Sequence, residues 1–233
     1  SGSGIYRPVK LICTPPVHIA NWGVNVQTKR IASSEATIVV SAKVKNETSV
    51  PKTVSLYTLL EKGEKQTSDK VLIPAGKEVE LSQEIKVMQP RLWDLEHPNL
   101  YQAIVKVVDE GNKVLDETKQ NFGIRELKFS TEGFFLNGKK LLINGGCVHH
   151  DNGLLGAAAF DKAEERKVRL MKEAGFNAIR TSHNLPSEAF LNACDRLGML
   201  VIDEAFDGWR DEKNKYDYST LFDKYWQQDV DAM

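Results

Sequence analysis

The sequence has almost no excess of charge of either sign. Its 31 Lys and Arg residues nearly balance 32 Asp and Glu residues, which leaves a formal net charge of −1. Nucleic acids and anionic membrane surfaces attract clusters of basic residues, so this balance argues against either partner. No acidic run of the kind found in solvating tails is present. We therefore expect a neutral or small ligand.

Long hydrophobic runs and paired cysteines are also missing. No run approaches the ~18 apolar residues that a membrane-spanning helix needs, and the polar start of the chain does not resemble a signal peptide. Cys13, Cys147 and Cys194 are too far apart for a CxxC motif, and their odd number argues against a disulfide framework. We expect buried or unreactive thiols. Because the chain starts at Ser1 and ends within a helical pattern, we also expect a segment of a longer protein.

The first ~120 residues alternate apolar and polar side chains with the period of two that marks half-buried strands. Turn-forming residues separate the alternating segments, and no helical period interrupts them. About seven short strands over such a length predict an immunoglobulin-like β-sandwich at residues 11–123. The clearest of these predicted strands cover residues 17–28, 36–44, 53–60, 78–87 and 101–108.

The pattern changes after Gly123. Asn137 and Gly138 lie between apolar segments and predict a hairpin with a type I′ turn. Predicted strands at 141–145, 177–180 and 199–203 then alternate with predicted helices at 160–174, 187–197 and 221–233. Asp161 and Glu164 suggest a capped start for the first helix, and Gly175 its end. Alternating strands and helices predict βα units around a parallel sheet.

Residues 124–233 hold only about three such units. A closed (β/α)₈ barrel takes about 250 residues. The predicted fold class is therefore multidomain: an all-β immunoglobulin-like sandwich followed by an incomplete α/β, TIM-barrel portion. An unfinished sheet exposes its apolar residues, so we expect self-association or mobility of this portion. The residues expected to be exposed are Leu142, Ile143, Ile179 and Val201.

Polar side chains follow each of the three predicted barrel strands. The carboxyl ends of barrel strands form the rim where such folds bind ligands, so we predict a binding site there. The candidates are Cys147, His149, His150 and Asp151 after the first strand, Thr181, Ser182, His183 and Asn184 after the second, and Asp203, Glu204, Asp207 and Trp209 after the third.

Each candidate also has a structural interpretation. His149 and His183 recur at equivalent positions, which favours a site over chance. The adjacent His149 and His150 must point in different directions, so only one of them can face it.

The carboxylates Asp203 and Glu204 could instead pair with an arginine such as Arg180. Trp209 suits the apolar C–H face of a sugar ring but could equally pack at the rim. A metal site formed by His149, Asp151 and His183 uses suitable ligand types, yet no HExxH-like spacing supports it, so we predict none.

Several segments, in order along the chain, resemble glycoside hydrolase family 2, which contains β-galactosidases, β-glucuronidases and β-mannosidases. Gly-Ile-Tyr-Arg-Pro-Val at 4–9 is similar to the strand that leaves the family's jelly-roll sugar-binding domain, which assigns residues 1–10 to that strand. The other matching segments are Leu-Trp-Asp at 92–94, His-Pro-Asn-Leu-Tyr at 97–101, Phe-Gly-Ile-Arg at 122–125, Phe-Leu-Asn-Gly-Lys at 135–139, Gly-Phe-Asn-Ala-Ile-Arg-Thr-Ser-His at 175–183 and Asp-Glu-Ala-Phe-Asp-Gly-Trp at 203–209.

The resemblance implies a retaining exo-β-glycosidase, in which two carboxyl groups about 5–5.5 Å apart act through a covalent glycosyl intermediate. In the family both carboxyl groups belong to glutamates that come later in the barrel than this chain reaches. The glutamate that acts as acid/base directly follows an Asn. The only Asn-Glu pair here, Asn46-Glu47, lies in a predicted sandwich turn and is rejected. We therefore expect no catalytic residue in this chain and no activity of the chain alone.

The resemblance carries over substrate-binding positions instead. His149 and His183 match the family's two histidines that contact sugar hydroxyls, and Asp207 and Trp209 fall near other pocket positions. Glu204, Asn184 and Asp151 are further candidates. The expected substrate is a β-galactoside-like carbohydrate, without nucleic-acid or membrane partners, in the cytoplasm or periplasm of a bacterium.

The stretch around His149 lacks the Arg and the His and Glu neighbours that well-known bacterial β-galactosidases carry there. A magnesium ligand set is therefore not transferred to these residues, and no cofactor is predicted in the chain. A divalent cation elsewhere in a longer protein is left open.

Two other interpretations remain. One is a complete small hydrolase that uses Glu204 and Asp207 as its carboxylate pair, although three βα units would leave strand edges unpaired. The other is a non-catalytic carbohydrate- or protein-interaction module built on the sandwich.

Overall fold

The computed structural model describes residues 4–61, 63–231 and 233. The chain divides into two compact units, one spanning Leu11–Leu141 and the other combining the residues before it with Leu142–Met233. Each unit has its own cluster of buried apolar residues. The two units are therefore described separately.

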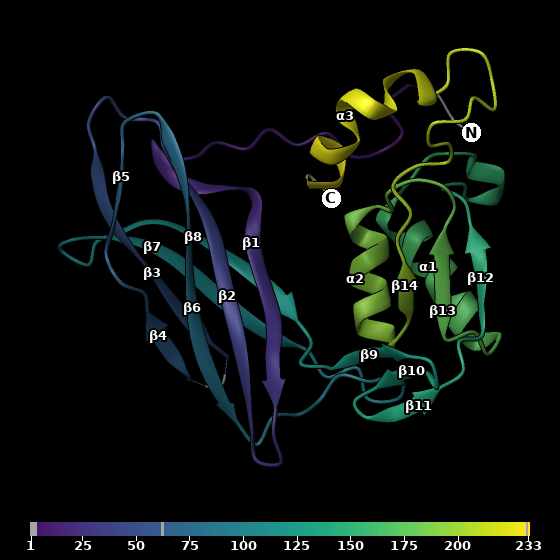
Figure 1. Cartoon of the computed structure of the whole chain (residues 1–233), viewed down its shortest axis with the longest axis horizontal. Helices are drawn as coiled ribbons and strands as arrows, with labels where there is room; N and C mark the ends of the chain where they lie inside the picture. The colour runs from purple at the N-terminus through teal and green to yellow at the C-terminus, as the bar shows by residue number, and fades with distance from the viewer. Residues whose placement is uncertain (1–3, 62, 232) are drawn as a thin grey trace. The chain divides into compact units, whose positions relative to one another are not determined.

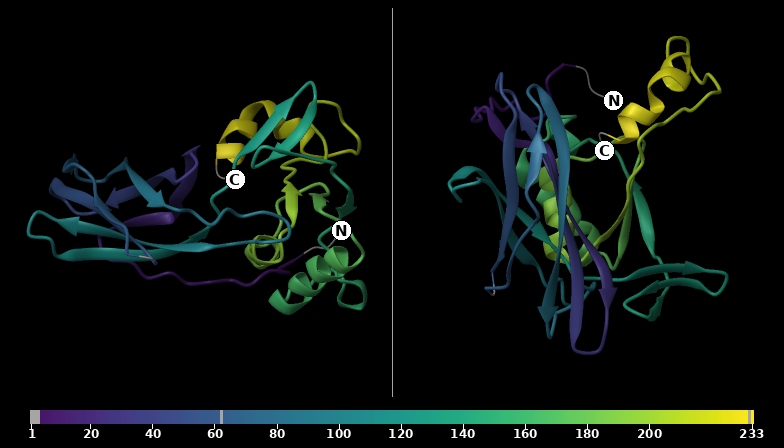
Figure 2. Two further views of the ribbon diagram at one scale, coloured as in Figure 1. Left: turned by 90° about the horizontal axis from the view of Figure 1, so that it is seen from below. Right: turned by 60° about the vertical axis from the view of Figure 1, so that its left-hand side comes forward.

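The first unit contains two antiparallel sheets, whose strands can be followed in Figures 1 and 2. This arrangement confirms the predicted immunoglobulin-like sandwich. The five clearest predicted strands are all present, and β4, β5 and β8 join them among the described residues. One sheet has the order β1-β2-β6, from β1 (Val17–Ile31), β2 (Glu35–Asn46) and β6 (Lys77–Met88); the other has the order β4-β3-β7-β8, with β5 also paired to β3, from β3 (Lys52–Leu60), β4 (Lys65–Thr67), β5 (Val71–Ile73), β7 (Tyr101–Asp109) and β8 (Val114–Phe122).

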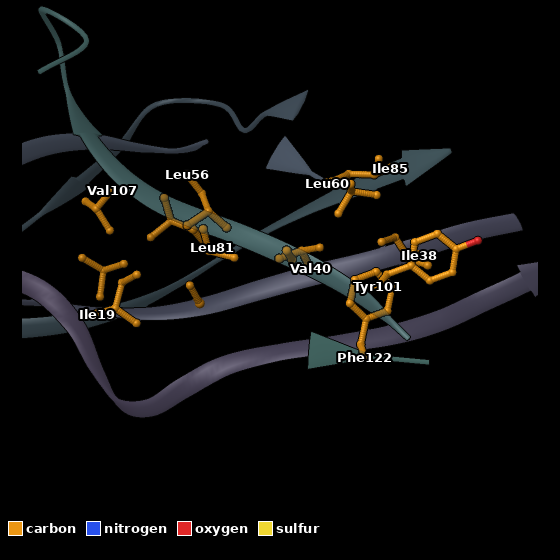
Figure 3. Packing of buried hydrophobic residues seen from close by; sticks show 14 of the residues in the cluster. Ile19, Ile38, Val40, Leu56, Leu60, Leu81, Ile85, Tyr101, Val107 and Phe122 are labelled. Carbon is orange, nitrogen blue, oxygen red and sulfur yellow. The ribbon is translucent and has the colours of Figure 1, made fainter. Parts of the chain in front are cut away.

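The sandwich core follows directly from the alternation in the sequence. Along β6, the side chains from Leu81 to Val87 alternate between buried and exposed, as one-sided burial of a sheet requires. Figure 3 shows residues of both sheets in this core, with Ile38 and Val40 from β2, Leu56 from β3 and Tyr101 from β7. The inner faces of the two sheets thus stabilise each other by apolar burial.

A short three-stranded sheet follows the sandwich, formed by β9 (Leu127–Ser130), β10 (Gly133–Leu136) and β11 (Lys139–Leu141). The φ angles of Asn137 and Gly138 are 51° and 75°, as the predicted type I′ turn requires. The Asn137 side chain also donates to the Trp93 carbonyl at 3.0 Å. By its contacts this sheet belongs to the sandwich unit, which ends at Leu141.

The second unit contains a parallel sheet of order β12-β13-β14 with helices between its strands. This confirms the prediction of about three βα units. The elements are β12 (Gly145–Val148), the 3₁₀ helix η1 (Gly153–Leu155), α1 (Asp161–Glu173), β13 (Ala178–Thr181), α2 (Glu188–Leu197), β14 (Leu200–Ile202) and α3 (Ser219–Asp231), and Figure 1 shows their order.

The predicted strand at 141–145 is wrong, because pairing with β13 begins only at Gly145. Leu142 and Ile143 precede it and are exposed, as predicted. The side chain of Asn177 accepts from the Asn144 backbone N–H at 2.8 Å, and this bond fixes the chain just before the strand. A side chain at Gly145 would place its Cβ 2.7 Å from the Ala178 carbonyl oxygen, so the close strand contact tolerates only glycine there.

The predicted exposure of Ile179 is wrong as well. Ile179 is fully buried and Val201 partly so, because both pack against α1 and α2 through Val168 and Phe190. The helices thus cover one face of the sheet. Side chains alternate across a strand, so Arg180 is directed to the opposite face, where it is only half-buried.

Local signals account for both ends of α2 and for the end of α1. Ser187 caps α2 by accepting from the Phe190 N–H, and Gly198 ends that helix with a φ of 71°. Gly175, with a φ of 87°, follows α1 as predicted. The predicted cap of α1 is wrong: the helix starts after Phe160 without a side-chain cap, and Glu164 is instead buried.

The predicted terminal strand at residues 1–10 does not form among residues 4–10, and residues 1–3 lie outside the described residues. A strand needs a neighbouring strand to pair with, and none pairs with this segment here. Its assignment to a jelly-roll domain stays a prediction. Across the described residues, none of the helices has the length and apolar character needed to span a membrane.

Candidate functional site

The three parallel strands of the second unit place their carboxyl ends at one edge of the sheet. His149 follows β12, His183 follows β13 and Glu204 follows β14. This is the edge at which βα folds bind ligands. The structure therefore brings side chains more than 50 residues apart into one cluster.

The two histidines predicted to recur at equivalent positions contact each other. Their ring centroids are 5.4 Å apart, and the rings meet edge to face at 81°. His183 Nδ1 lies 3.0 Å from Glu204 Oε2, and its Nε2 lies 3.8 Å from Asp207 Oδ1. His183 thus lies between two carboxylates and also contacts the ring of His149.

Arg180 holds this cluster from the strand side. Its Nη2 donates to Glu204 Oε1 at 2.7 Å, which confirms the arginine–carboxylate pair suggested by the sequence. The side chain of Thr181 adds a second support by donating to Asp203 Oδ1 at 2.9 Å and accepting from the Glu204 backbone N–H. Burial raises the pKa of Asp203, although hydrogen bonds to its carboxyl from the Thr181 hydroxyl and the Glu204 backbone N–H oppose the rise. The first residues after β14 are therefore fixed by β13.

Asp207 and Trp209 lie on the exposed loop after β14. The ammonium group of Lys213 is 2.9 Å from Asp207 Oδ1 and lowers the pKa of that carboxyl. Trp209 is 64% exposed and stacks one face on Phe222 of α3, with centroids 5.8 Å apart and planes at 16°. One face of the Trp209 ring therefore packs at the rim, as its structural interpretation expects. A hollow of about 310 Å³ adjoins it, lined by Asp203, Glu204, Phe206, Trp209, Phe222 and Trp226.

His150 does not share the contacts of His149, as expected for adjacent residues. Its ring stacks on Tyr6 at 5.3 Å, and its Nδ1 accepts from Asn184 Nδ2 at 3.1 Å. Burial, with a smaller contribution from the positive charge of Arg7, lowers the pKa of His150. Asp151 is exposed beside this pair. The candidates His150 and Asn184 thus form a second contact between the loops that carry His149 and His183.

Of the expectation of buried or unreactive thiols, burial is confirmed for Cys194 alone, and unreactivity of the other two stays a prediction. Cys194 is buried, and burial raises its pKa. Cys13 and Cys147 are exposed. The Ser182 hydroxyl and the Arg180 guanidinium, the latter 3.4 Å from the sulfur, lower the pKa of Cys147. Register explains the pairing, since Cys147 and Arg180 are partners across β12 and β13.

Sequence reasoning missed Tyr6 as a neighbour of the site. Nothing local in the sequence marks it, because its contacts with the site are to His150 and Ala159, over 140 positions away. As for metals, no group of three or more His, Cys, Asp or Glu residues suited to a metal ion occurs in the part of the chain that the structure describes.

The fold and the cluster together define a class of protein. It is a β-sandwich followed by the opening units of a (β/α)₈ barrel, with imidazoles and carboxylates at the edge where barrel enzymes bind their substrates. Two family models agree with this division: "Glycosyl hydrolases family 2" matches residues 17–125, and "Glycosyl hydrolases family 2, TIM barrel domain" matches residues 127–214. The chain belongs to glycosyl hydrolase family 2.

Relatives of known name are similar over nearly the whole chain. A β-galactosidase of Bacteroides ovatus is 39% identical over 99% of this chain, and a putative β-glucuronidase of Formosa agariphila is 36% identical over 97%. A solved structure of a family 2 member from Bacteroides cellulosilyticus superposes with a TM-score of 0.87, at 45% identity over 94% of this chain. The chain spans 28%, 22% and 29% of the lengths of these three proteins, respectively.

Proposed function

We propose that this chain is the sandwich and first barrel portion of a retaining exo-β-glycosidase, a β-galactosidase, that hydrolyses terminal β-glycosidic bonds in carbohydrate catabolism. The observation that carries the proposal is the cluster of His149, His183 and Glu204 at the carboxyl ends of three successive strands. The relatives support the activity, since the two named above are a β-galactosidase and a putative β-glucuronidase.

In this proposal His149 and His183 contact the hydroxyl groups of the sugar. Arg180 holds Glu204, and Glu204 accepts a hydrogen bond from Nδ1 of His183. That bond orients the ring and leaves Nε2 to act toward the substrate. Asp207, 3.8 Å from Nε2, provides a second polar contact on the same side. The free face of Trp209 offers a surface for the C–H side of a pyranose.

A hydrolytic pair formed by Glu204 and Asp207 is not compatible with this geometry. The His183 ring lies between the two carboxylates, with Glu204 Oε2 3.0 Å from Nδ1 and Asp207 Oδ1 3.8 Å from Nε2. Glu204 is also paired with Arg180. We therefore propose that the two catalytic glutamates belong to a further part of the barrel, and that this chain alone does not hydrolyse glycosides.

The test is a panel of 4-nitrophenyl β-glycosides offered to this chain and to the full-length protein that contains it. The panel includes the galactoside, glucuronide, mannoside and glucoside. We expect hydrolysis by the full-length protein only, fastest on the galactoside. Turnover by this chain that is lost in Glu204→Gln would refute the assignment of the catalytic pair. Sugar binding without turnover by the full-length protein would favour an interaction module.

A further inference from the structure

The segment before the sandwich contacts the loops of the proposed sugar site. Tyr6 stacks on the ring of His150, and its carbonyl accepts from the Ala159 N–H at 2.9 Å. Arg7 donates from Nη2 to the Leu185 carbonyl at 2.6 Å and lies 5.6 Å from the centre of the Tyr6 ring. Two adjacent residues therefore contact both the loop after β12 and the loop after β13.

These two loops contact each other through two successive pairs of residues. His149 meets His183, and the next residue of each loop, His150 and Asn184, form the second contact. Asn184 Nδ2 can only donate a hydrogen bond, so Nδ1 of His150 accepts it. The proton of the His150 ring therefore lies on Nε2. The first pair belongs to the proposed sugar site, while the second pair lies against Tyr6 and Arg7.

We propose that Tyr6 and Arg7 are positioning residues for His149 and His183, an inference that rests on the proposed function. We call these two residues the N-terminal clamp. Neither contacts a sugar-binding side chain directly. The clamp fixes His150 from its free ring face and fixes the loop after β13 at Leu185, and the backbone transmits both constraints to the neighbouring histidines.

The burial pattern of the segment supports this assignment. Tyr6 and Arg7 are partly buried, whereas the residues on either side of them are exposed, Ile5 to 86% and Val9 to 79%. Loops held by few buried contacts move easily. A stacked ring and a charge-assisted hydrogen bond are each strong enough to limit that motion. Tyr6 and Arg7 are thus the partly buried residues of segment 4–10, and Lys10 adds an exposed ion pair with Glu188 at 3.1 Å.

The clamp is tested in this chain by NMR of the histidine rings. Three variants are compared with the wild type: Tyr6→Ala removes the stacked ring, Tyr6→Phe keeps it, and Ile5→Ala is the matched control at an exposed neighbour. The methyl resonance of the buried Met199 verifies that each variant retains its folded core. We expect Tyr6→Ala to shift the ring resonances of His149 and His183, and Tyr6→Phe and Ile5→Ala to leave them unchanged.

His150 itself must shift in Tyr6→Ala, since it loses the ring current of its neighbour. A change confined to His150, with His149 and His183 unaffected, would therefore overturn the proposal. In the full-length enzyme, misplacement of binding groups by a fraction of an ångström to 1 Å lowers kcat/KM by about tenfold to a hundredfold. We expect that loss for Tyr6→Ala on 4-nitrophenyl β-D-galactopyranoside, with Tyr6→Phe restoring the rate and Ile5→Ala matching the wild type.

The two measurements separate the clamp from the proposed function. A full-length protein that hydrolyses no glycoside refutes the function, and the ring resonances of this chain then decide the clamp alone. Loss of kcat/KM in Tyr6→Ala with restoration in Tyr6→Phe supports both. A Tyr6→Ala enzyme that is folded and as fast as Ile5→Ala overturns the clamp while leaving the function intact.

Discussion

Replacing Glu164 by Gln removes one charge from a buried carboxylate that joins three segments of the second unit. Its Oε1 accepts from Asn152 Nδ2 at 2.9 Å and from Lys167 Nζ at 3.2 Å, and its Oε2 accepts from Ser187 Oγ at 2.8 Å. Ser187 is the cap of α2, and Lys167 also donates to the His149 carbonyl. The substitution therefore perturbs α1, the start of α2 and the loop after β12 together.

The size of the effect follows from the donors that remain. Glutamine is neutral and has one acceptor oxygen in place of two, so Lys167 loses its charged partner and the Ser187 hydroxyl must turn to accept from the amide. Loss of a charge-assisted hydrogen bond in a buried site costs about 2–3 kcal/mol. For a unit of about 100 residues, in which 1 kcal/mol corresponds to roughly 4–8 °C, this lowers the Tm by roughly 10–20 °C.

The loss also depends on pH. Burial alone would raise the pKa of Glu164, but the hydrogen bonds from Asn152 and Ser187 and the charge of Lys167 outweigh burial and lower it overall. A carboxyl whose pKa is lowered by folding stabilises the native state above its unfolded pKa, about 4.3 for a glutamate. The difference between wild type and Glu164→Gln is therefore fully present at neutral pH and shrinks as the pH falls below about 4.3.

The assay is thermal denaturation at several pH values, with Glu165→Gln as the matched control. Glu165 is the next residue of α1 and forms only exposed ion pairs, with Lys162 and Arg196. Exposed pairs contribute about 0–1 kcal/mol, so the control should change the Tm little. Equal shifts in the two variants, or a Glu164→Gln shift that does not diminish at low pH, would refute the reasoning.

Three further predictions address other parts of the chain. Cys147 should react faster with iodoacetamide at neutral pH than Cys194 in the native protein, as followed by mass spectrometry, because only the thiolate reacts; preferential labelling of Cys194 would contradict the assigned burial. Gly123→Ala should destabilise the sandwich by about 1–3 kcal/mol in urea denaturation, because its Cβ would lie 2.7 Å from that of Trp93, while Gly111→Ala serves as the tolerant control. In the full-length enzyme, His183→Ala should lower kcat/KM on the galactoside by roughly a hundredfold, and a change smaller than about threefold would argue against contact with the sugar.

Much of the fold could be predicted because it follows from local periodicity. The strands of the sandwich, the hairpin turn at Asn137 and Gly138 and the alternation of helices and strands all derive from patterns within a few residues. The failures concern contacts between distant segments. The strand predicted at 141–145 was displaced because its start depends on pairing with Ala178, which alternation alone does not specify.

The candidate site was predicted in the same partial way. The sequence predicted that His149, His183 and Glu204 each follow a strand, and the structure brings all three together. The roles assigned to them stay predictions. The partners of these residues were harder to predict from the sequence. The contact of His183 with Asp207 and that of Tyr6 with His150 require loops to fold back on one another. Loop geometry follows from packing rather than from composition.

By itself the sequence determined the division into a β-sandwich and βα units and the edge at which the polar residues gather, since both follow from side-chain periods of two and 3.6 residues. Only the tertiary structure decided which groups share a hydrogen bond. Ile179 is buried and Arg180 half-buried, although they are adjacent on one strand, because α1 and α2 cover only one face of the sheet. That asymmetry leaves Arg180 free to pair with Glu204, and with this pair it sets the orientation of His183.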